Sequence, residues 1–257
     1  MDKPQAIYGR HPVAELLRAR RRGVRRLLLA EGAEPKGVLD EILRQAAELG
    51  VPLEHVSRSQ LGTYSPQHQG LVALVDPYPY VQLSDILERA AERAEPPLVL
   101  LLDELQDPQN LGTLLRTAEA VGVHGVVLTQ HRGAGVTEAV VASSAGASEH
   151  LLIAQSNLVQ ALGALRRAGG WILGLERSAE AQPLDRLDLE GPLGVVVGSE
   201  GHGLRRLVRE NCDFLGYLPM RGQVDSLNAA VAGSIALYTI WSRRGYPGES
   251  PVQGRPH

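Results

Sequence analysis

Residues 218–233 read Leu218-Pro-Met-Arg-Gly-Gln-Val-Asp-Ser-Leu-Asn-Ala-Ala-Val-Ala-Gly233, a strand end, a polar loop and the start of a helix. Apolar residues recur at mostly helical spacing from Leu227 to Trp241, which predicts a helix over residues 226–243. Ser226 is a suitable N-cap, because its hydroxyl can accept from the free amides of the first turn. The small residues up to Gly233 would let another backbone come close. Asn228 either ties down the preceding loop or meets polar groups from elsewhere in the chain.

Strands and helices alternate along the chain from residue 98 onward. Apolar strands are predicted at 98–102, 125–129, 151–153, 171–175, 193–198 and 214–218, and helices at 111–121, 136–142, 157–168, 204–210 and 226–243. Near-continuous apolar strands separated by helices indicate an α/β fold with a mainly parallel sheet covered on both faces. Ligands of such sheets bind beyond the carboxyl ends of the strands, where the polar and glycine-rich segments of this chain fall. We therefore expect those segments to converge on one site.

The first 76 residues are predicted to form a separate α/β/α unit. It has helices at about 12–20 and 37–49 and strands at 26–30, 51–56 and 70–75. Two proline clusters, at 76–79 and 95–97, flank a short amphipathic helix over residues 83–94. We predict an N-terminal domain over residues 1–76, a linker over 77–97, a second domain over 98–245 and a flexible tail over 246–257.

The composition excludes several classes of protein. The chain of 257 residues has a net charge of −3, but residues 1–75 hold 11 Lys/Arg against 8 Asp/Glu, so only a local basic surface is plausible. An aromatic content of 4% argues against a stacking platform for single-stranded nucleic acid. With Cys212 as the single cysteine, an internal disulfide and a cysteine-based metal site are excluded. The absence of a signal peptide and of a membrane-spanning stretch predicts a soluble, cytoplasmic protein without membrane contact.

The basic surface is predicted near the first helix. Arginines at positions 18, 20, 21, 22, 25 and 26 surround Gly23. Such a cluster is either a solvated helix end or a patch that contacts phosphates. The turn-rich loop at 65–70 offers His68 and Gln69 to a ligand, although a lone histidine is more often structural.

Two further polar segments carry candidate chemistry. Residues 107–118 read as a turn feeding a helix, which Asn110 could cap, with Arg116 near the apolar inner face. An arginine in that setting needs an anion, either an acidic neighbour such as Asp103, Glu104 or Glu119, or a phosphate. Residues 195–204 join a buried strand to a helix through a glycine-rich turn that is neither a P-loop nor a dinucleotide motif. Its Glu200 would repel a phosphate and favours a ligand with cationic or hydrogen-donating groups.

Together, residues 107–118, 198–204 and 219–232 resemble the motifs of the SpoU (TrmH) family of RNA ribose 2′-O-methyltransferases, within the SPOUT superfamily. Residues 145–149 are a supporting match, and the resemblance covers most of residues 98–243. Residues 8–13 and 68–73 resemble the L30e-like substrate-binding domain of the branch that methylates guanosine in large-subunit ribosomal RNA. One departure is Ala230, where the family commonly has Ser.

The resemblance implies a SPOUT α/β domain with a deep trefoil knot, S-adenosyl-L-methionine as cofactor, a homodimer and no metal. The residues that fall on the family's cofactor positions are Gly198, Leu218, Met220 and Leu227. Those on its catalytic positions are Asn110, Arg116, Glu200, Ser226 and Asn228. The candidate RNA-binding residues are Arg10, Arg18, Arg20, Arg21, Arg22, His68 and Gln69. Family proposals make Arg116 the base, but a guanidinium is too basic to lose its proton easily, so we expect Arg116 to position phosphate and stabilise charge, its role as base staying open.

The predicted activity is methyl transfer from S-adenosylmethionine to a ribose 2′-hydroxyl, with a guanosine of large-subunit ribosomal RNA as the favoured acceptor. One alternative is a transfer-RNA ribose methyltransferase. Another is a non-catalytic ribosomal-RNA-binding or assembly factor, at which Ala230 hints. A dinucleotide-dependent oxidoreductase is disfavoured because no strand is followed by the required glycine pattern.

Overall fold

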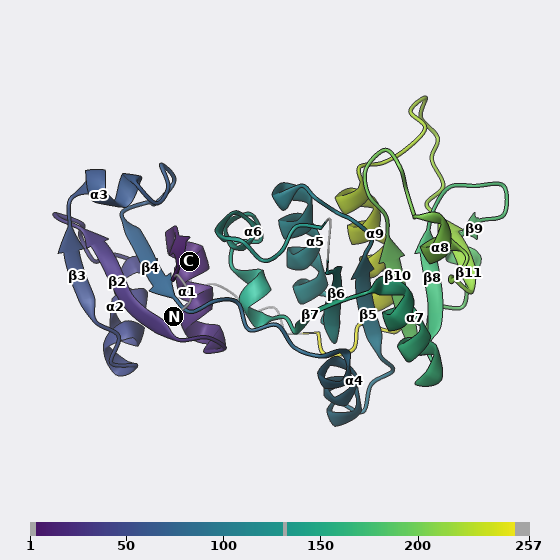
Figure 1. Cartoon of the computed structure of the whole chain (residues 1–257), viewed down its shortest axis with the longest axis horizontal. Helices are drawn as coiled ribbons and strands as arrows, with labels where there is room; N and C mark the ends of the chain where they lie inside the picture. Colours follow the sequence, from purple (N-terminus) through teal and green to yellow (C-terminus); the bar gives the residue numbers. More distant parts are fainter. Residues whose placement is uncertain (1–3, 131–132, 250–257) are drawn as a thin grey trace.

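The computed structural model describes residues 4–130 and 133–249, and its strands form two separate sheets (Figure 1). The smaller sheet has four strands in the order β1-β4-β2-β3, with β4 antiparallel to both of its neighbours. The elements of this part are β1 (Gln5–Tyr8), α1 (Arg10–Ala19), β2 (Val24–Ala30), α2 (Val38–Glu48), β3 (Leu53–Val56), α3 (Arg58–Gly62) and β4 (Leu71–Val75).

The larger sheet has seven strands in the order β7-β6-β5-β10-β8-β11-β9, and every pairing in it is parallel. The carboxyl ends of its strands therefore lie along one edge. The elements of this part are α4 (Leu83–Glu92), β5 (Leu98–Leu102), α5 (Pro108–Ala120), β6 (Gly125–Thr129), α6 (Glu138–Ser143), η1 (Ala147–His150), β7 (Ile153–Ser156), α7 (Leu158–Arg167), β8 (Trp171–Leu175), β9 (Gln182–Pro183), η2 (Leu184–Arg186), β10 (Leu193–Val197), α8 (Arg206–Arg209), β11 (Phe214–Tyr217) and α9 (Ala229–Arg243).

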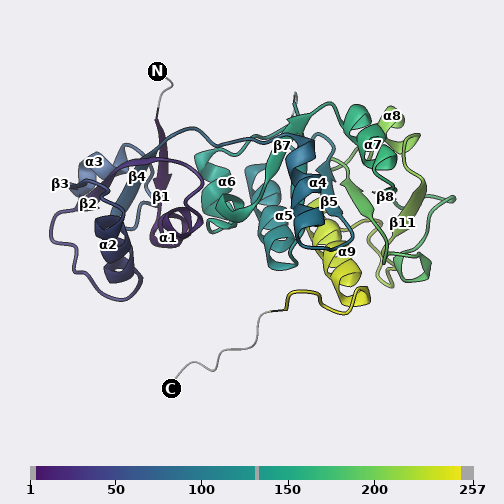
Figure 2. The ribbon, with the colours of Figure 1, turned by 90° about the horizontal axis from the view of Figure 1, so that it is seen from below.

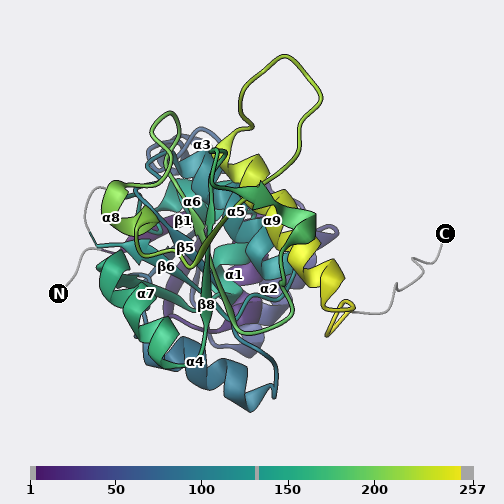
Figure 3. The same cartoon turned by 90° about the vertical axis from the view of Figure 1, so that its right-hand side faces the viewer.

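Helices cover both faces of the larger sheet, as the sequence predicts. Leu100 and Leu102 of β5 join the core under α5, α6 and α9, whereas Val99 and Leu101 join the core under α4, α7 and α8. This alternation follows from the strand geometry, in which successive side chains point to opposite faces. Figure 3 shows α5 and α9 on one side of the strands and α7 and α8 on the other.

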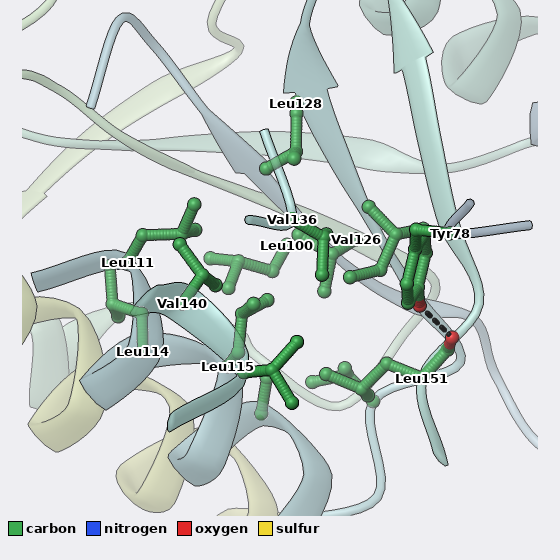
Figure 4. Packing of buried hydrophobic residues seen from close by; sticks show 14 of the residues in the cluster. Tyr78, Leu100, Leu111, Leu114, Leu115, Val126, Leu128, Val136, Val140 and Leu151 are labelled. Atoms are coloured by element: carbon green, nitrogen blue, oxygen red, sulfur yellow. Dashed lines mark hydrogen bonds between the residues drawn. The ribbon is translucent and has the colours of Figure 1, made fainter. Parts of the chain in front are cut away.

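The linker reaches the core of the larger domain at Tyr78. Figure 4 shows this ring at the margin of the cluster formed by α5, α6 and the central strands, with its hydroxyl bonded to the carbonyl of Leu151. The side chain is 6% exposed, and burial raises the pKa of the Tyr78 hydroxyl. The N-terminal part is therefore not joined by a free linker but sits against the larger domain (Figure 2).

The predicted elements and the observed ones differ at a few places. The strands β5, β6 and β8 have the predicted limits, but β7 begins at Ile153, two residues later than predicted. The helix α9 begins at Ala229 rather than at 226, because Asn228 and not Ser226 is its N-cap. Five short elements were not predicted: β1, α3, η1, β9 and η2.

The predicted tail over residues 246–257 is described in part. Of the predicted tail, Tyr246 packs on Trp241 with ring centroids 4.8 Å apart, and residues 250–257 lie outside the described residues. In the part that the structure describes, helices long and apolar enough to cross a membrane are absent.

Candidate active site

Loops at the carboxyl ends of β8, β10 and β11, together with the segment before α9, enclose a pocket of about 500 Å³. Its size is that of a small-molecule site. The wall is formed by apolar, glycine and polar residues: Leu175, Glu176, Arg177, Val197, Gly198, Ser199, Glu200, Gly201, Gly203, Gly216, Tyr217, Leu218, Met220, Asp225, Ser226, Leu227, Asn228, Ala229 and Ala232. All four predicted cofactor residues are in this set.

Glu200 and Asn228 of the pocket wall form a polar triad with Asn110. The Asn110 amide donates to Glu200 Oε1 at 2.7 Å, and Asn228 Nδ2 donates to Asn110 Oδ1 at 3.0 Å and also to Glu200 Oε1. The side-chain oxygen of Asn228, Oδ1, accepts from the backbone amides of Ala230 and Val231 at 2.9 and 3.1 Å. The same side chain therefore caps α9. Three segments separated by 90 and 28 residues thus meet at one carboxylate.

Glu200 projects from a turn that requires glycine on both sides. The backbones of Ser199 and Gly203 exchange two hydrogen bonds of 3.1 Å, which closes a tight hairpin over residues 199–203. A Cβ on Gly198 would lie 2.3 Å from the carbonyl carbon of Gly203, a distance that real Cβ atoms do not adopt. Gly198 therefore lets strand β10 run directly against the hairpin, and the wall of the pocket there is bare backbone.

The start of α5 differs from the prediction. Asp107 caps the helix by accepting from the amides of Gln109 and Asn110, which leaves the Asn110 side chain free to reach Glu200. Arg116 was predicted near the inner face, but it is exposed and outside the pocket wall. The predicted acidic partners Asp103 and Glu104 bind Arg205 instead.

The exposure of Arg116 has a geometric cause. Arg116 follows Asn110 by six positions in α5. The two residues are therefore about 9 Å apart along the helix axis, and their side chains point about a third of a turn apart around it. Leu114 and Leu115 take the buried positions of this turn of the helix, and Arg116 is left on the solvent face. Among the residues that the structure describes, no hydrogen bond or ion pair holds its guanidinium.

Ala230, where the family commonly has serine, lies outside the pocket wall, so the missing hydroxyl does not affect the pocket. Its side chain is 1% exposed on the face of α9 that packs on the core, and the pocket wall is made by Ala229 and Ala232 instead. The departure from the family pattern therefore removes no polar group from the wall.

The pocket carries acidic residues that the sequence reasoning missed. Glu176 and Asp225 join Glu200 on the wall, opposed by Arg177. Glu176 is held in place by Arg209, whose Nε donates to Glu176 Oε1 at 2.8 Å, and this hydrogen bond raises the pKa of Arg209. The signal was available, because Glu176 and Arg177 directly follow a predicted strand. The excess of carboxylates makes the pocket suited to a cationic ligand.

The arginine cluster does not form a single RNA-binding patch. Arg22 is buried and donates to both carboxylate oxygens of Glu149, at 3.0 and 2.6 Å. Arg21 donates to the Tyr78 hydroxyl at 3.0 Å. Arg18 pairs with Glu15 and Glu41. Arg22 is therefore buried in the contact between the two domains and is not accessible to RNA, contrary to the prediction, and Arg21 is engaged in the same contact. Arg20 is exposed.

The other candidate RNA-binding residues lie at the opposite end of α1. Gln69 accepts the backbone amide of Arg10 at 3.1 Å, and His68 Nδ1 accepts that of Gly70 at 2.8 Å. The strand register places Tyr8 opposite Val72 and Val24 opposite Val75, so Arg10 and Arg22 are at different ends of the small sheet. A ten-residue helix spans about 15 Å between them.

Across residues 4–130 and 133–249, there is no group of three or more His, Cys, Asp or Glu side chains arranged to hold a metal ion. Cys212 is half-buried, and burial raises the pKa of its thiol to about 12.

Comparisons with known proteins agree with the arrangement of these two domains. Residues 97–238 match the model of the SpoU rRNA Methylase family, and residues 6–81 match that of the RNA 2′-O ribose methyltransferase substrate-binding domain. YacO of Bacillus subtilis, assigned to the TrmH family of tRNA/rRNA methyltransferases, is 40% identical over 95% of this chain and 97% of its own length. The 23S rRNA (guanosine-2′-O-)-methyltransferase RlmB of Coxiella burnetii is 38% identical over 97% of this chain and all of its own.

A solved structure shares the same architecture. The SpoU methyltransferase AviRb of Streptomyces viridochromogenes, crystallised in complex with the cofactor AdoMet, superposes with a TM-score of 0.77 at 26% identity. The superposition covers 93% of this chain and 90% of that one. With two family models and full-length relatives in agreement, the chain belongs to the SpoU (TrmH) family of RNA methyltransferases.

Proposed function

We propose that this protein transfers a methyl group from S-adenosylmethionine to a ribose 2′-hydroxyl of RNA, and that its acceptor is a guanosine of large-subunit ribosomal RNA. The observation that carries the proposal is the meeting of Asn110 with Glu200 and Asn228, two residues of the pocket wall. Each comes from a different one of the three family-like segments. The pocket wall and the polar triad together provide a place for a donor beside a place for an acceptor.

The pocket fits the cofactor that SpoU methyltransferases use. The bare backbone at Gly198 would be filled by any Cβ, and Leu218, Met220 and Leu227 offer apolar surface for a nucleoside. Carboxylates on the wall complement a ligand that carries a sulfonium and an ammonium group. We assign Gly198, Leu218, Met220 and Leu227 to binding this cofactor. When bound, S-adenosylmethionine supplies a methyl group already activated by the positive charge on sulfur.

In the proposed reaction, the protein aligns the methyl donor with the acceptor and stabilises the negative charge that develops on the acceptor oxygen. Asn228 and Ser226 are proposed to orient the ribose or the carboxylate of the cofactor, and Glu200 fixes both asparagine amides. Alignment of this kind lowers the barrier by removing translational and rotational freedom before the reaction. Arg116, exposed and unengaged among the described residues, is proposed to hold a phosphate of the acceptor nucleotide and to stabilise the oxygen as negative charge develops on it.

The N-terminal domain supports ribosomal RNA as the substrate class. Residues 6–81 match a substrate-binding model, and the Coxiella relative named for guanosine-2′-O methylation of 23S rRNA aligns over its full length. We propose that Arg10 and the loop carrying His68 and Gln69 contact RNA, with Arg18 and Arg20 offering weaker electrostatic contacts. The trefoil knot of the C-terminal domain and the homodimer are further proposals from the family.

The function is tested by incubation with labelled S-adenosylmethionine and unmodified transcripts of large-subunit ribosomal RNA, small-subunit ribosomal RNA and transfer RNA. We expect label in the large-subunit transcript, in an alkali-resistant dinucleotide that contains 2′-O-methylguanosine. Label confined to transfer RNA would reassign the substrate. Cofactor binding without transfer to any RNA would favour the non-catalytic assembly factor.

A further inference from the structure

A buried ion pair joins the two domains. Arg22 lies just beyond α1 and Glu149 lies in η1, and their side chains are both 1% exposed. The guanidinium uses Nε and Nη2 for the two carboxylate oxygens, and its Nη1 donates to Gln5 Oε1 at 2.6 Å and to the Asp76 carbonyl at 3.3 Å. All three nitrogens of the guanidinium therefore donate, and the three segments that carry Glu149, Gln5 and Asp76 are tied to one side chain.

Tyr78 completes the same junction from the linker. Its hydroxyl lies 2.8 Å from the carbonyls of Ser148 and Leu151, and it accepts from Arg21. The guanidinium carbons of Arg21 and Arg22 lie 5.6 and 5.5 Å from the centre of its ring, within cation–π range. The linker is thus fixed at the point where it leaves the N-terminal domain.

The helix α1 meets η1 at two further points. Glu15 Oε2 lies 2.8 Å from His150 Nε2, and Gly146 faces Pro12. A Cβ on Gly146 would lie 2.7 Å from Glu15 Cβ and 3.0 Å from Pro12 Cα, so glycine is needed for the helix to come this close. Three contacts spread along α1 fix an orientation, which a single contact could not do.

The energetics indicate that this junction provides orientation rather than stability. Burying a charged pair costs desolvation energy that the mutual attraction only repays when the geometry is good, and an apolar pair is often at least as stable. What a bidentate pair adds is a single allowed geometry. A domain on a free tether would need neither the pair nor Gly146.

The orientation that results places two functional surfaces on one edge of the molecule. Figure 1 shows the loop that follows α3 and the loop that precedes α9 both along the upper edge, with the larger sheet ending there. The first loop carries His68 and Gln69, and the second forms the pocket wall. Neither α1 nor η1 is in the pocket, so the junction can act on the reaction only through the placement of the domains.

We infer that Arg22 and Glu149 are positioning residues that hold the N-terminal domain at a fixed distance from the methyl-transfer pocket, so that the RNA must present a recognition element and a target ribose at that separation. The inference rests on the proposed function. A rigid connection raises the effective concentration of the target at the pocket for RNA that fits the spacing, and excludes RNA that does not.

The test compares the variant Arg22→Ala/Glu149→Ala with the matched control Arg26→Ala/Glu54→Ala, which removes an exposed ion pair (54% and 51% exposed) from the N-terminal domain. Spin labels at Ser59→Cys and Gln160→Cys, both exposed, report the distance between the domains. The native Cys212, which is half-buried, is replaced in every labelled protein (Cys212→Ser), so that only the two introduced cysteines carry a label. Removing both charges avoids the uncompensated buried ion that a single substitution would leave.

We expect a narrow distance distribution in the native protein and in the control, and a broad one in Arg22→Ala/Glu149→Ala. With full-length large-subunit transcript, KM should rise about tenfold with kcat retained, whereas a minimal fragment around the methylated nucleotide should be methylated as by the native protein. S-adenosylmethionine affinity by calorimetry should be unchanged, which shows that the larger domain is folded. The reversed pair Arg22→Glu/Glu149→Arg should recover part of the KM.

Two results would overturn the inference. One is a distribution that stays narrow without the pair, and the other is a broadened distribution with unchanged KM for the full-length transcript. If the native protein methylates no RNA, the proposed function fails, and the distance measurement still decides whether the pair fixes the domains.

Discussion

At the scale of the residue, Asn228 couples the fold to the site. One end of its amide caps α9 and the other meets Glu200 and Asn110. Aspartate is as good an N-cap as asparagine, so Asn228→Asp should keep the free energy of unfolding within about 0.5 kcal/mol. It would, however, place a second carboxylate against Glu200 and remove the donor.

We therefore expect Asn228→Asp to lose methyl transfer while melting close to the native temperature. Asn228→Ala, which also loses the cap, should be destabilised by about 1 kcal/mol. Thermal unfolding and RNA methylation measured on both variants separate the two roles. Full activity of Asn228→Asp would show that the amide donor is not used in the reaction.

The Arg116 side chain is exposed, and no hydrogen bond or ion pair within the described residues holds its guanidinium. Because it lies outside the pocket wall, Arg116→Ala should bind S-adenosylmethionine with native affinity. Loss of the charge that holds phosphate should lower kcat by about 100-fold or more. The control is Arg167→Ala on α7, an exposed arginine on the other face of the sheet. Turnover near the native rate would remove Arg116 from the catalytic set.

At the scale of the element, the hairpin over residues 199–203 sets the shape of the pocket. Gly198→Ala would force the hairpin away from β10, since the added Cβ would meet the Gly203 carbonyl at 2.3 Å. We expect at least a tenfold weaker affinity for S-adenosylmethionine, measured by calorimetry, in a protein that still folds, because a displaced wall costs more than 1.4 kcal/mol or about tenfold in binding. Gly191→Ala, with no atom within 4 Å, is the control and should bind normally.

The sequence was informative for elements whose pattern is local. The apolar runs of β5, β6 and β8 predicted their limits, because buried parallel strands are apolar on both faces. The start of α9 was misplaced because Ser226 and Asn228 are both good N-caps, and the choice depends on Glu200 from another loop. The short helix α3 has a capping box between Ser57 and Gln60, a signal that was present but not used.

Contacts between segments far apart in the chain could not be predicted from the sequence. Arg22 and Glu149 are 127 residues apart, and a run of arginines reads as surface charge until its partner is known. For the same reason the gathering of Asn110, Glu200 and Asn228 was expected only from the rule that strand ends share an edge, and the exposure of Arg116 was not expected at all.

At the scale of the whole molecule, α9 leaves an apolar stripe in solvent. Val231, Ile235 and Tyr238 are 44%, 43% and 53% exposed at helical spacing, while Ala230, Gly233 and Leu237 face the core. The small residues bring α9 against α5, where Gly233 lies under Leu114. The large residues are therefore left on the solvent side of the helix, where the ring of Tyr238 meets the edges of Trp241 and Tyr246, and a row of this kind marks a contact surface.

We predict that the protein forms a homodimer and that this stripe is its contact surface. The stripe begins directly after Asn228, so a second copy seated on it would also shield the pocket segment that contains the exposed Leu227. Ile235→Asp/Tyr238→Asp should give a monomer by light scattering, because two buried carboxylates without partners cost several kcal/mol. Methyl transfer should fall with the dimer, and Gln160→Asp on α7 should change neither. A native protein that is monomeric at micromolar concentration would contradict the prediction, whereas a dimeric double variant would move the contact to another face.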